Sequence, residues 1–279
     1  MKVISLFSGC GGLDLGFENA GFEVVYANDV WNNCWETYEK NHGHKIDGRS
    51  IVEVKSDEIP EADGIIGGPP CQSWSLAGAM RGIKDKRGQL FYEYIRILQD
   101  KKPKFFLAEN VPGMISRTHI EEFKKIICQF SKWGYTVTYK LLDARDYGVP
   151  QERKRVIIVG YQNDLNLSFN FPPPTHSQHP VKDKLNKWLS LEETIKDLPE
   201  VKSALEKNYA NPPETLNFPN HEYMTGSFSS IYMSRNRLKC WNEPSYTIQA
   251  GGRHAPLHPS STKIDRKSTR LNSSHGKLS

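Results

Sequence analysis

Short apolar runs alternate with helical segments from Lys2 to Tyr161. The runs with the length and composition of buried strands are Lys2–Phe7, Phe22–Asn28, Gly64–Ile66, Phe105–Ala108, Tyr135–Leu142 and Val156–Tyr161. The segments that space their apolar side chains as helices do are Leu13–Ala20, Trp31–Asn41, Leu90–Asp100 and Ile120–Phe130. This βαβα order predicts an α/β protein built on a mostly parallel, doubly wound sheet.

Chemically distinctive residues follow four of these strands. A glycine-rich turn occupies residues 8–12, Asp29 ends the second strand, and Glu109 ends the fourth. The run Gly67–Gln72 must leave the third strand, because neither its glycines nor its prolines sustain a central strand. Parallel strands end at one edge of a sheet, and open α/β sheets bind ligands at that edge. We therefore predict one active site there.

Each feature has an ordinary structural explanation beside a chemical one. A glycine turn after a strand suits a nucleotide-like ligand, yet many α/β folds use one for packing alone. Asp29 can accept hydrogen bonds from ribose hydroxyls. Cys71 is either a structural cysteine or, where its surroundings lower its pKa, a thiolate nucleophile. Residues 72–89 form either a mobile active-site lid or a solvated loop.

Composition limits the setting and the partners. The hydrophobic fraction of 37% and the mean hydropathy of −0.60 describe a soluble protein, and the apolar opening is too short for a signal peptide or a membrane span. Five widely spaced cysteines favour a reducing, cytosolic setting without disulfides, and nine histidines form no zinc signature. The net charge of +5 falls to +2 without residues 265–279, so contacts with nucleic acid must come from local patches.

The composition changes at Phe171–Pro174, beyond which the sequence is irregular and rich in proline. In the segment Ile231–Lys239, an extended backbone would place Arg235, Arg237 and Lys239 on one face. Arginine pairs with guanine edges in the major groove through two donors at once. A solvated charged strand face has the same pattern, so both interpretations stay open.

Together these motifs resemble those of the DNA (cytosine-5)-methyltransferase family. Residues 7–12 resemble its S-adenosylmethionine loop, Pro69-Pro70-Cys71-Gln72 its nucleophile motif, Glu109-Asn110-Val111 its acid motif, and Gln151-x-Arg153-x-Arg155 a later motif. The resemblance covers roughly residues 1–260 and is greatest to bacterial modification enzymes of restriction systems, of the kind that methylate GGCC. It implies a Rossmann-like S-adenosylmethionine-dependent methyltransferase domain at residues 1–171 and a smaller, irregular target-recognition domain at residues 172–264.

The implied reaction moves a methyl group from S-adenosylmethionine to carbon 5 of a cytosine in a specific duplex DNA site, which protects host DNA from restriction. The Cys71 thiolate would add to carbon 6 of a flipped-out base, while Glu109 holds the N3 edge and Arg155 the O2 atom. Arg153 would hold phosphate or order its loop. The resemblance implies double-stranded DNA as the partner, no metal, no membrane, and a monomer in the cytoplasm.

Binding residues follow from the same resemblance. Those implied for the cofactor are Phe7, Gly9, Gly11, Gly12, Leu13, Asp29, Val30, Ser50, Ile51 and Pro70. Those implied for DNA are Gln72, Arg81, Arg235, Arg237 and Arg253. Ser50 is a departure, because the family usually has an aspartate there that accepts from the adenine amino group.

The end of the chain is a larger departure. The family's closing motifs, an Arg-rich helix and a Gly-Asn-x-Val-Pro segment, do not occur, and residues 265–279 resemble one translated frame of a sequencing adapter. We expect these residues to be a non-native tail and the closing segment of the catalytic domain to be missing, which would leave the chain poorly soluble and inactive.

Other functions remain open at this point. An RNA cytosine-5 methyltransferase would share the Pro-Pro-Cys and Glu-Asn-Val motifs, and a catalytically dead fragment would at most bind DNA. A nicotinamide-dependent dehydrogenase is disfavoured, because it gives Cys71, Glu109 and Arg155 no joint role.

Overall fold

The computed structural model describes residues 1–70, 89–198, 202–203, 222–224, 239–248, 259 and 270–271. The chain divides into two compact units. The first comprises Met1–Leu142 and Lys154–Pro172, and the second comprises Asp143–Arg153 and Pro173–Leu278. The chain therefore enters the second unit at Asp143, returns to the first at Lys154, and enters the second again at Pro173.

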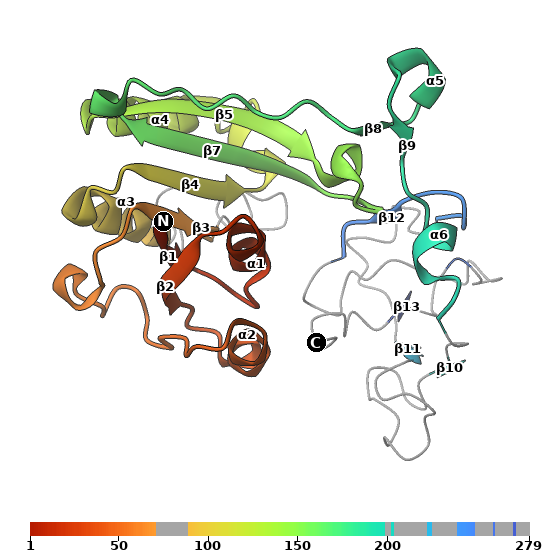
Figure 1. The fold of residues 1–279 in the computed structure, drawn as a ribbon, viewed down its shortest axis with the longest axis horizontal. Helices are drawn as coiled ribbons and strands as arrows, with labels where there is room; N and C mark the ends of the chain where they lie inside the picture. Colours follow the sequence, from red (N-terminus) through yellow and green to blue (C-terminus); the bar gives the residue numbers. More distant parts are fainter. Residues whose placement is uncertain are drawn as a thin grey trace. The chain divides into compact units, whose positions relative to one another are not determined.

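Strands and helices alternate through the first unit (Figure 1). They are β1 (Lys2–Leu6), α1 (Gly12–Asn19), β2 (Glu23–Asn28), α2 (Trp35–His42), β3 (Gly64–Gly67), α3 (Gln89–Lys101), β4 (Phe105–Asn110), α4 (Ile120–Lys132), β5 (Tyr135–Asp143) and β7 (Lys154–Gln162). Short 3-10 turns lie at Asn32–Cys34, Ser56–Glu58, Pro112–Ile115 and Asn163–Leu165. The alternation confirms the α/β class predicted from the sequence.

One six-stranded sheet, in the order β2-β1-β3-β4-β7-β5, forms the centre of this unit. Strand β1 pairs in parallel with β2 and β3, and β3 pairs in parallel with β4. Strand β7 runs antiparallel to β4, with Asn110 opposite Val156. The sheet is thus mostly parallel, as predicted, with a reversal at β7 that the sequence analysis does not anticipate.

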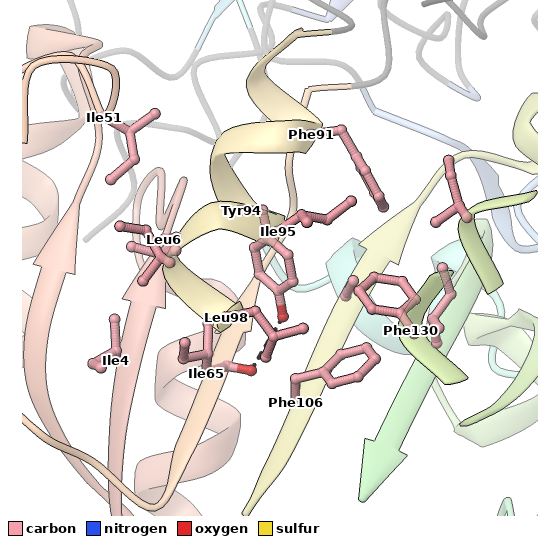
Figure 2. Close-up of a cluster of buried hydrophobic side chains, with 14 of the residues drawn as sticks. Ile4, Leu6, Ile51, Ile65, Phe91, Tyr94, Ile95, Leu98, Phe106 and Phe130 are labelled. Carbon is pink, nitrogen blue, oxygen red and sulfur yellow. Dashed lines mark hydrogen bonds between the residues drawn. The ribbon is translucent and has the colours of Figure 1, made fainter. Parts of the chain in front are cut away.

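The sheet buries apolar side chains on both faces, because successive residues of a strand point in opposite directions. On one face, Phe106 of β4 packs against Phe130 of α4, with ring centroids 4.6 Å apart, in a cluster that α3 also covers (Figure 2). On the other face, the neighbouring Phe105 stacks on Phe17 of α1, with centroids 6.4 Å apart. Burial on both faces explains why the strands are short, almost continuously apolar runs.

The second unit has shorter elements. They are β6 (Gln151–Glu152), a 3-10 turn (Ala144–Tyr147), β8 (His176–Ser177), α5 (Pro180–Asp183), β9 (Asn186–Lys187), α6 (Leu191–Ile195), β10 (Lys202–Ser203), β11 (Glu222–Met224), β12 (Ser245–Tyr246) and β13 (Arg270–Leu271). Strand β6 pairs with β12, β8 with β9, and β11 with both β10 and β13. The longest of these elements, the helix α6, has five residues.

None of the helices within the described ranges is long and apolar enough to cross a membrane.

Tyr94 of α3 provides a test of how the helix is fixed to the sheet. Its ring is fully buried, and its hydroxyl lies 3.0 Å from the Leu107 carbonyl oxygen and 3.2 Å from that of Ile65. Tyr94→Phe removes this donor and should lower the free energy of unfolding by about 0.5–1.5 kcal/mol in urea denaturation. Tyr92→Phe, at a ring that is 44% exposed, is the matched control and should change it little. Equal stability of Tyr94→Phe and the wild type would show that the hydroxyl does not anchor the helix.

Candidate active site

Five segments of the first unit come together at the carboxyl edge of the parallel strands. Parallel pairing brings the loop after β1, the end of β2, the loop after β3 and the end of β4 to this edge. Because β7 is antiparallel, its first residues arrive at the same edge. The structure therefore brings the glycine loop, Asp29, Pro70, Glu109 and Arg155 to one side of the sheet.

An ion pair joins the ends of β4 and β7. The Nε atom of Arg155 lies 2.6 Å from Oε1 of Glu109, and the two side chains are 20% and 29% exposed. The other oxygen of Glu109 faces the loop after β3, since a Cβ added to Gly68 would lie 3.4 Å from Oε2. A carboxylate and a guanidinium side by side offer an acceptor and donors to the edge of one planar ring.

Asn110 connects the loop after β3 to β4. Its Nδ2 atom donates to the Pro69 carbonyl oxygen at 3.3 Å, and its Oδ1 atom accepts from the Val111 amide at 3.0 Å. The side chain is 2% exposed, so both bonds are shielded from water. Cys71, which follows Pro70 directly, lies outside the described residues together with Gln72 and Arg81.

The glycine loop turns sharply by left-handed backbone conformations. Phe7, Gly9 and Gly11 have φ angles of 58°, 56° and 82°. Phe7 is unusual in this region, because a side chain makes the conformation costly and such strain gathers at functional sites. The Gly9 amide donates to Oδ2 of Asp29 at 2.9 Å, so the loop and the end of β2 are held together.

These residues fit the adenosine half of S-adenosylmethionine. A Cβ added to Gly9 or to Gly12 would meet no atom within 4 Å, so there is space above the loop. The Asp29 carboxylate, fixed by the Gly9 and Trp31 amides at 2.9 and 2.8 Å, is an acceptor suited to ribose hydroxyls. The apolar side chains of Val30 and Trp31 are 63% and 51% exposed beside it, as a purine-stacking surface requires.

The remaining residues predicted for the cofactor lie around this loop. Leu13 of α1 packs against the apolar cluster that contains Val3 and Phe105. Pro70, in the loop that follows β3, is partly buried. Ile51 is 2% exposed, and Ser50, which is partly buried, accepts the Glu53 amide with its carbonyl oxygen at 2.8 Å.

A buried polar network supports the glycine loop, and its members carry no motif that marks them in the sequence. Asp14 is fully buried and accepts hydrogen bonds from Ser5 at 2.6 Å and from Tyr38 at 2.7 Å. Burial raises the pKa of Asp14 above its ordinary value, against the opposing effect of these two hydrogen bonds. The ring of Tyr38 stacks on His42 with centroids 4.4 Å apart.

The His42 side chain contacts the glycine loop at Gly11. It is 1% exposed, and Nδ1 lies 2.7 Å from Oε2 of Glu18. A Cβ added to Gly11 would lie 1.9 Å from Nε2 of His42, so the loop has no room for a side chain at this position. The only sequence signal for this contact is the spacing of Tyr38 and His42, which are four residues apart on one helix face.

Arg153 belongs to the second unit and has a different environment from Arg155. Its amide donates to Oδ1 of Asp143 at 3.2 Å, and its carbonyl oxygen accepts from Ala144 at 2.9 Å. Asp143 also pairs with Arg145 at 2.9 Å, and that guanidinium lies 4.0 Å from the ring centroid of Trp188. These contacts order the segment that carries Arg153. The predicted DNA-binding residues Arg235, Arg237 and Arg253 lie outside the described residues.

Within the described ranges, no three His, Cys, Asp or Glu side chains are grouped so that they could hold a metal ion.

A doubly wound sheet with a glycine loop and charged groups at its carboxyl edge is typical of α/β proteins that bind a nucleotide-like ligand there. The family model for C-5 cytosine-specific DNA methylases matches residues 1–277, and the chain belongs to that family. It is therefore a DNA cytosine methyltransferase of the restriction–modification type, and it uses S-adenosylmethionine as its methyl donor. This confirms the family resemblance and disfavours the RNA-directed and dehydrogenase interpretations.

Similar proteins agree with this assignment. The chain is 59% identical over 264 residues to the type II methyltransferase M.MthTI of Methanothermobacter thermautotrophicus, which covers 95% of the chain and 77% of that protein. It is 54% identical over 273 residues to M.FnuDI of Fusobacterium nucleatum, covering 95% and 76%. A crystal structure described as a prophage-encoded DNA modification methyltransferase of Escherichia coli has the same fold, with a TM-score of 0.66 at 22% identity over 99% of this chain and 93% of that one.

Gly11→Ala tests the tight contact between the glycine loop and its support. The substitution places a side chain on a backbone with φ of 82° and against His42, so we expect a loss of stability of about 2 kcal/mol or more and weaker cofactor binding. The control is Gly16→Ala, where an added Cβ meets nothing within 4 Å and where alanine favours the helix by up to about 1 kcal/mol. Thermal unfolding and cofactor titration measure both effects. Gly11→Ala with wild-type stability would contradict the contact.

Proposed function

We propose that the carboxyl edge of the first unit is where the cytosine is methylated, with Cys71 as the nucleophile. The observation that supports this most directly is the pair formed by Glu109 and Arg155, 2.6 Å apart beside the Gly68–Pro70 loop. Cys71 is the next residue in the chain after that loop. A nucleophile, an acceptor and donors are therefore supplied from three neighbouring segments.

In this proposal, the Cys71 thiolate forms a bond to carbon 6 of cytosine, and the electron pair of the 5,6 double bond makes carbon 5 nucleophilic. S-adenosylmethionine, when bound, supplies the methyl group that carbon 5 accepts and leaves as S-adenosylhomocysteine. Transfer of the carbon 5 proton to a base such as water then re-forms the 5,6 double bond and expels the Cys71 thiolate. Cytosine in a duplex is inaccessible to these groups, so the base must be flipped out of the helix.

Glu109 and Arg155 would hold the flipped base. Glu109 would bind the N3 edge and Arg155 the O2 atom, where charge develops while the cysteine adds. Arg153 would have a separate role, because it lies in the second unit on a segment ordered by Asp143. We assign to it a phosphate contact or the ordering of its own loop.

The cofactor would lie over the glycine loop. Backbone groups of Phe7, Gly9, Gly11, Gly12 and Leu13 would surround it, and Asp29 would bind the ribose. Val30, Ser50 and Ile51 would line the adenine side, and Pro70 would contact the cofactor from the nucleophile loop. The space above Gly9 and Gly12 supports this placement.

We further propose that residues 172–264 read the DNA sequence, with Arg235, Arg237 and Arg253 at base edges or phosphates and Gln72 and Arg81 near the flipped base. The proposed site is GGCC, because the region Arg235–His258 resembles that of enzymes that methylate this sequence. The enzyme would act as a monomer, since one chain carries both the catalytic motifs and the proposed recognition segment. It would act in the cytoplasm, because its five widely spaced cysteines favour a reducing setting.

Cys71→Ser should abolish methyl transfer to a duplex containing GGCC while cofactor and DNA binding persist, because a hydroxyl is rarely ionised at neutral pH. Transfer of a labelled methyl group measures activity, and a duplex with 5-fluorocytosine at the target should trap the wild type covalently but not the variant. An RNA of the same sequence is the substrate control and should accept no methyl group. Methyl transfer by Cys71→Ser would contradict the assignment of Cys71 as the nucleophile. If the wild type shows neither methyl transfer nor covalent trapping, the result would favour a catalytically dead protein that only binds DNA.

A further inference from the structure

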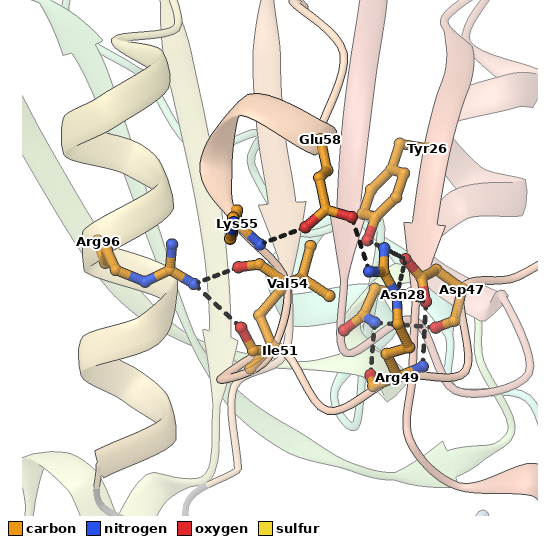
Figure 3. A network of polar contacts seen from close by, with 9 residues as sticks. All are labelled: Tyr26, Asn28, Asp47, Arg49, Ile51, Val54, Lys55, Glu58 and Arg96. Atoms are coloured by element: carbon orange, nitrogen blue, oxygen red, sulfur yellow. Dashed lines mark hydrogen bonds and ion pairs between the residues drawn. The ribbon is translucent and has the colours of Figure 1, made fainter.

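The loop Asp47–Glu58 carries Ser50 and Ile51, two of the residues proposed for the adenine side, and polar contacts hold it from two sides (Figure 3). From β2, the Nδ2 atom of Asn28 donates to the carbonyl oxygens of Asp47 and Arg49 at 2.8 and 2.9 Å. Asn28 is 1% exposed and directly precedes Asp29. Its amide therefore ties the loop to the strand end that carries the proposed ribose ligand.

From the opposite side, Arg96 of α3 reaches the same loop with a single guanidinium (Figure 3). Its Nη2 atom donates to the carbonyl oxygens of Ile51 at 3.0 Å and Val54 at 2.9 Å, Nη1 donates to Oγ of Ser56 at 2.8 Å, and Nε donates to Glu93 at 2.7 Å. The N–H groups of arginine form a rigid planar fork. One side chain can therefore fix several points of the loop at once.

These backbone contacts differ from an ordinary surface ion pair. The pair of Arg96 with Glu93 lies within one helix at a spacing of three residues, an arrangement that contributes little. The bonds to the loop instead join segments 45 and 42 residues apart in sequence. Ile51 and Val54 are 2% and 1% exposed, so water has little access to replace a lost donor.

Arg49 provides a contrast on the outer side of the loop. Its guanidinium pairs with Asp47 at 2.8 Å and with Glu58 at 2.7 Å, and its side chain is 47% exposed. Hydrogen bonds from Arg49 lower the pKa of Asp47 to about 2. Solvent screens these side-chain pairs, and Arg49 reaches no backbone of the loop from a distant element.

We propose that Arg96 is a positioning residue for adenine recognition: it sets the backbone of residues 51–54 from α3, so that Ser50 and Ile51 meet the adenine edge in a fixed geometry. Arg96 does not itself touch the cofactor in this account. It acts through the carbonyl groups of Ile51 and Val54. The inference rests on the proposed cofactor site.

The test compares S-adenosylhomocysteine with its inosine counterpart, which lacks the adenine amino group, by calorimetry on the 279-residue chain. The wild type should prefer the adenine compound. Arg96→Met should weaken the binding of S-adenosylhomocysteine by about tenfold, because the loop loses its donors. The ratio between the affinities for the adenine and inosine compounds should therefore fall. Arg96→Lys, which keeps the stem and the charge, should also narrow the preference, because an ammonium lacks the planar fork. Glu93→Gln is the matched control and should leave both affinities unchanged.

A folded Arg96→Met or Arg96→Lys that keeps the wild-type preference would overturn the inference, even if its melting temperature falls. The inference would also be overturned if Glu93→Gln lowered the preference for the adenine compound as much as Arg96→Met does. The bonds from Arg96 to the loop backbone would then not be the cause of that preference. If the wild type binds neither compound, the proposed cofactor site itself fails, which is a separate result.

Discussion

The antiparallel pairing of β7 with β4 is the constraint on which the proposed base side of the site depends. In a wholly parallel sheet, the amino end of β7 would lie at the edge opposite to Glu109. The observed register, with Asn110 opposite Val156, instead brings Arg155 to 2.6 Å from Glu109. The resulting charge-assisted pair fixes the two side chains to each other, and Oε2 of Glu109 faces Gly68 in the loop after β3.

The glycine loop, which forms the proposed cofactor side of the site, is supported differently. Its shape comes from left-handed backbone at Gly9 and Gly11 and from a fully buried layer in which Tyr38 bonds Asp14 and His42 contacts Gly11. Buried hydrogen bonds are costly to leave unmade, so this layer resists rearrangement more than the partly exposed ion pair does. The glycine loop therefore rests on a more completely buried support than the ion pair between Glu109 and Arg155 does.

Much of this arrangement can be predicted from the sequence, because the succession of strands and helices along the chain follows from local patterns, and parallel strands end at one edge of a sheet. The apolar run at Ile65 and Ile66 followed by glycines and prolines predicts both the buried strand and the exit of the chain from the sheet. The reversal of β7 is not predictable in this way, since an apolar run has no signal for its direction. The contacts of Arg96 with residues more than 40 positions away also escape local patterns, because only the folded chain brings them together.

The roles proposed for Glu109 and Arg155 require that the two groups act on the base as one unit. A double-mutant cycle in single-turnover methyl transfer, with Glu109→Gln, Arg155→Lys and both together, tests it most directly. Each single change should slow transfer by about 100-fold or more, and the double variant should be little slower than the worse single one. If the double variant instead slows methyl transfer by the product of the two single-variant factors, the two groups act independently. That result would contradict the proposed pair.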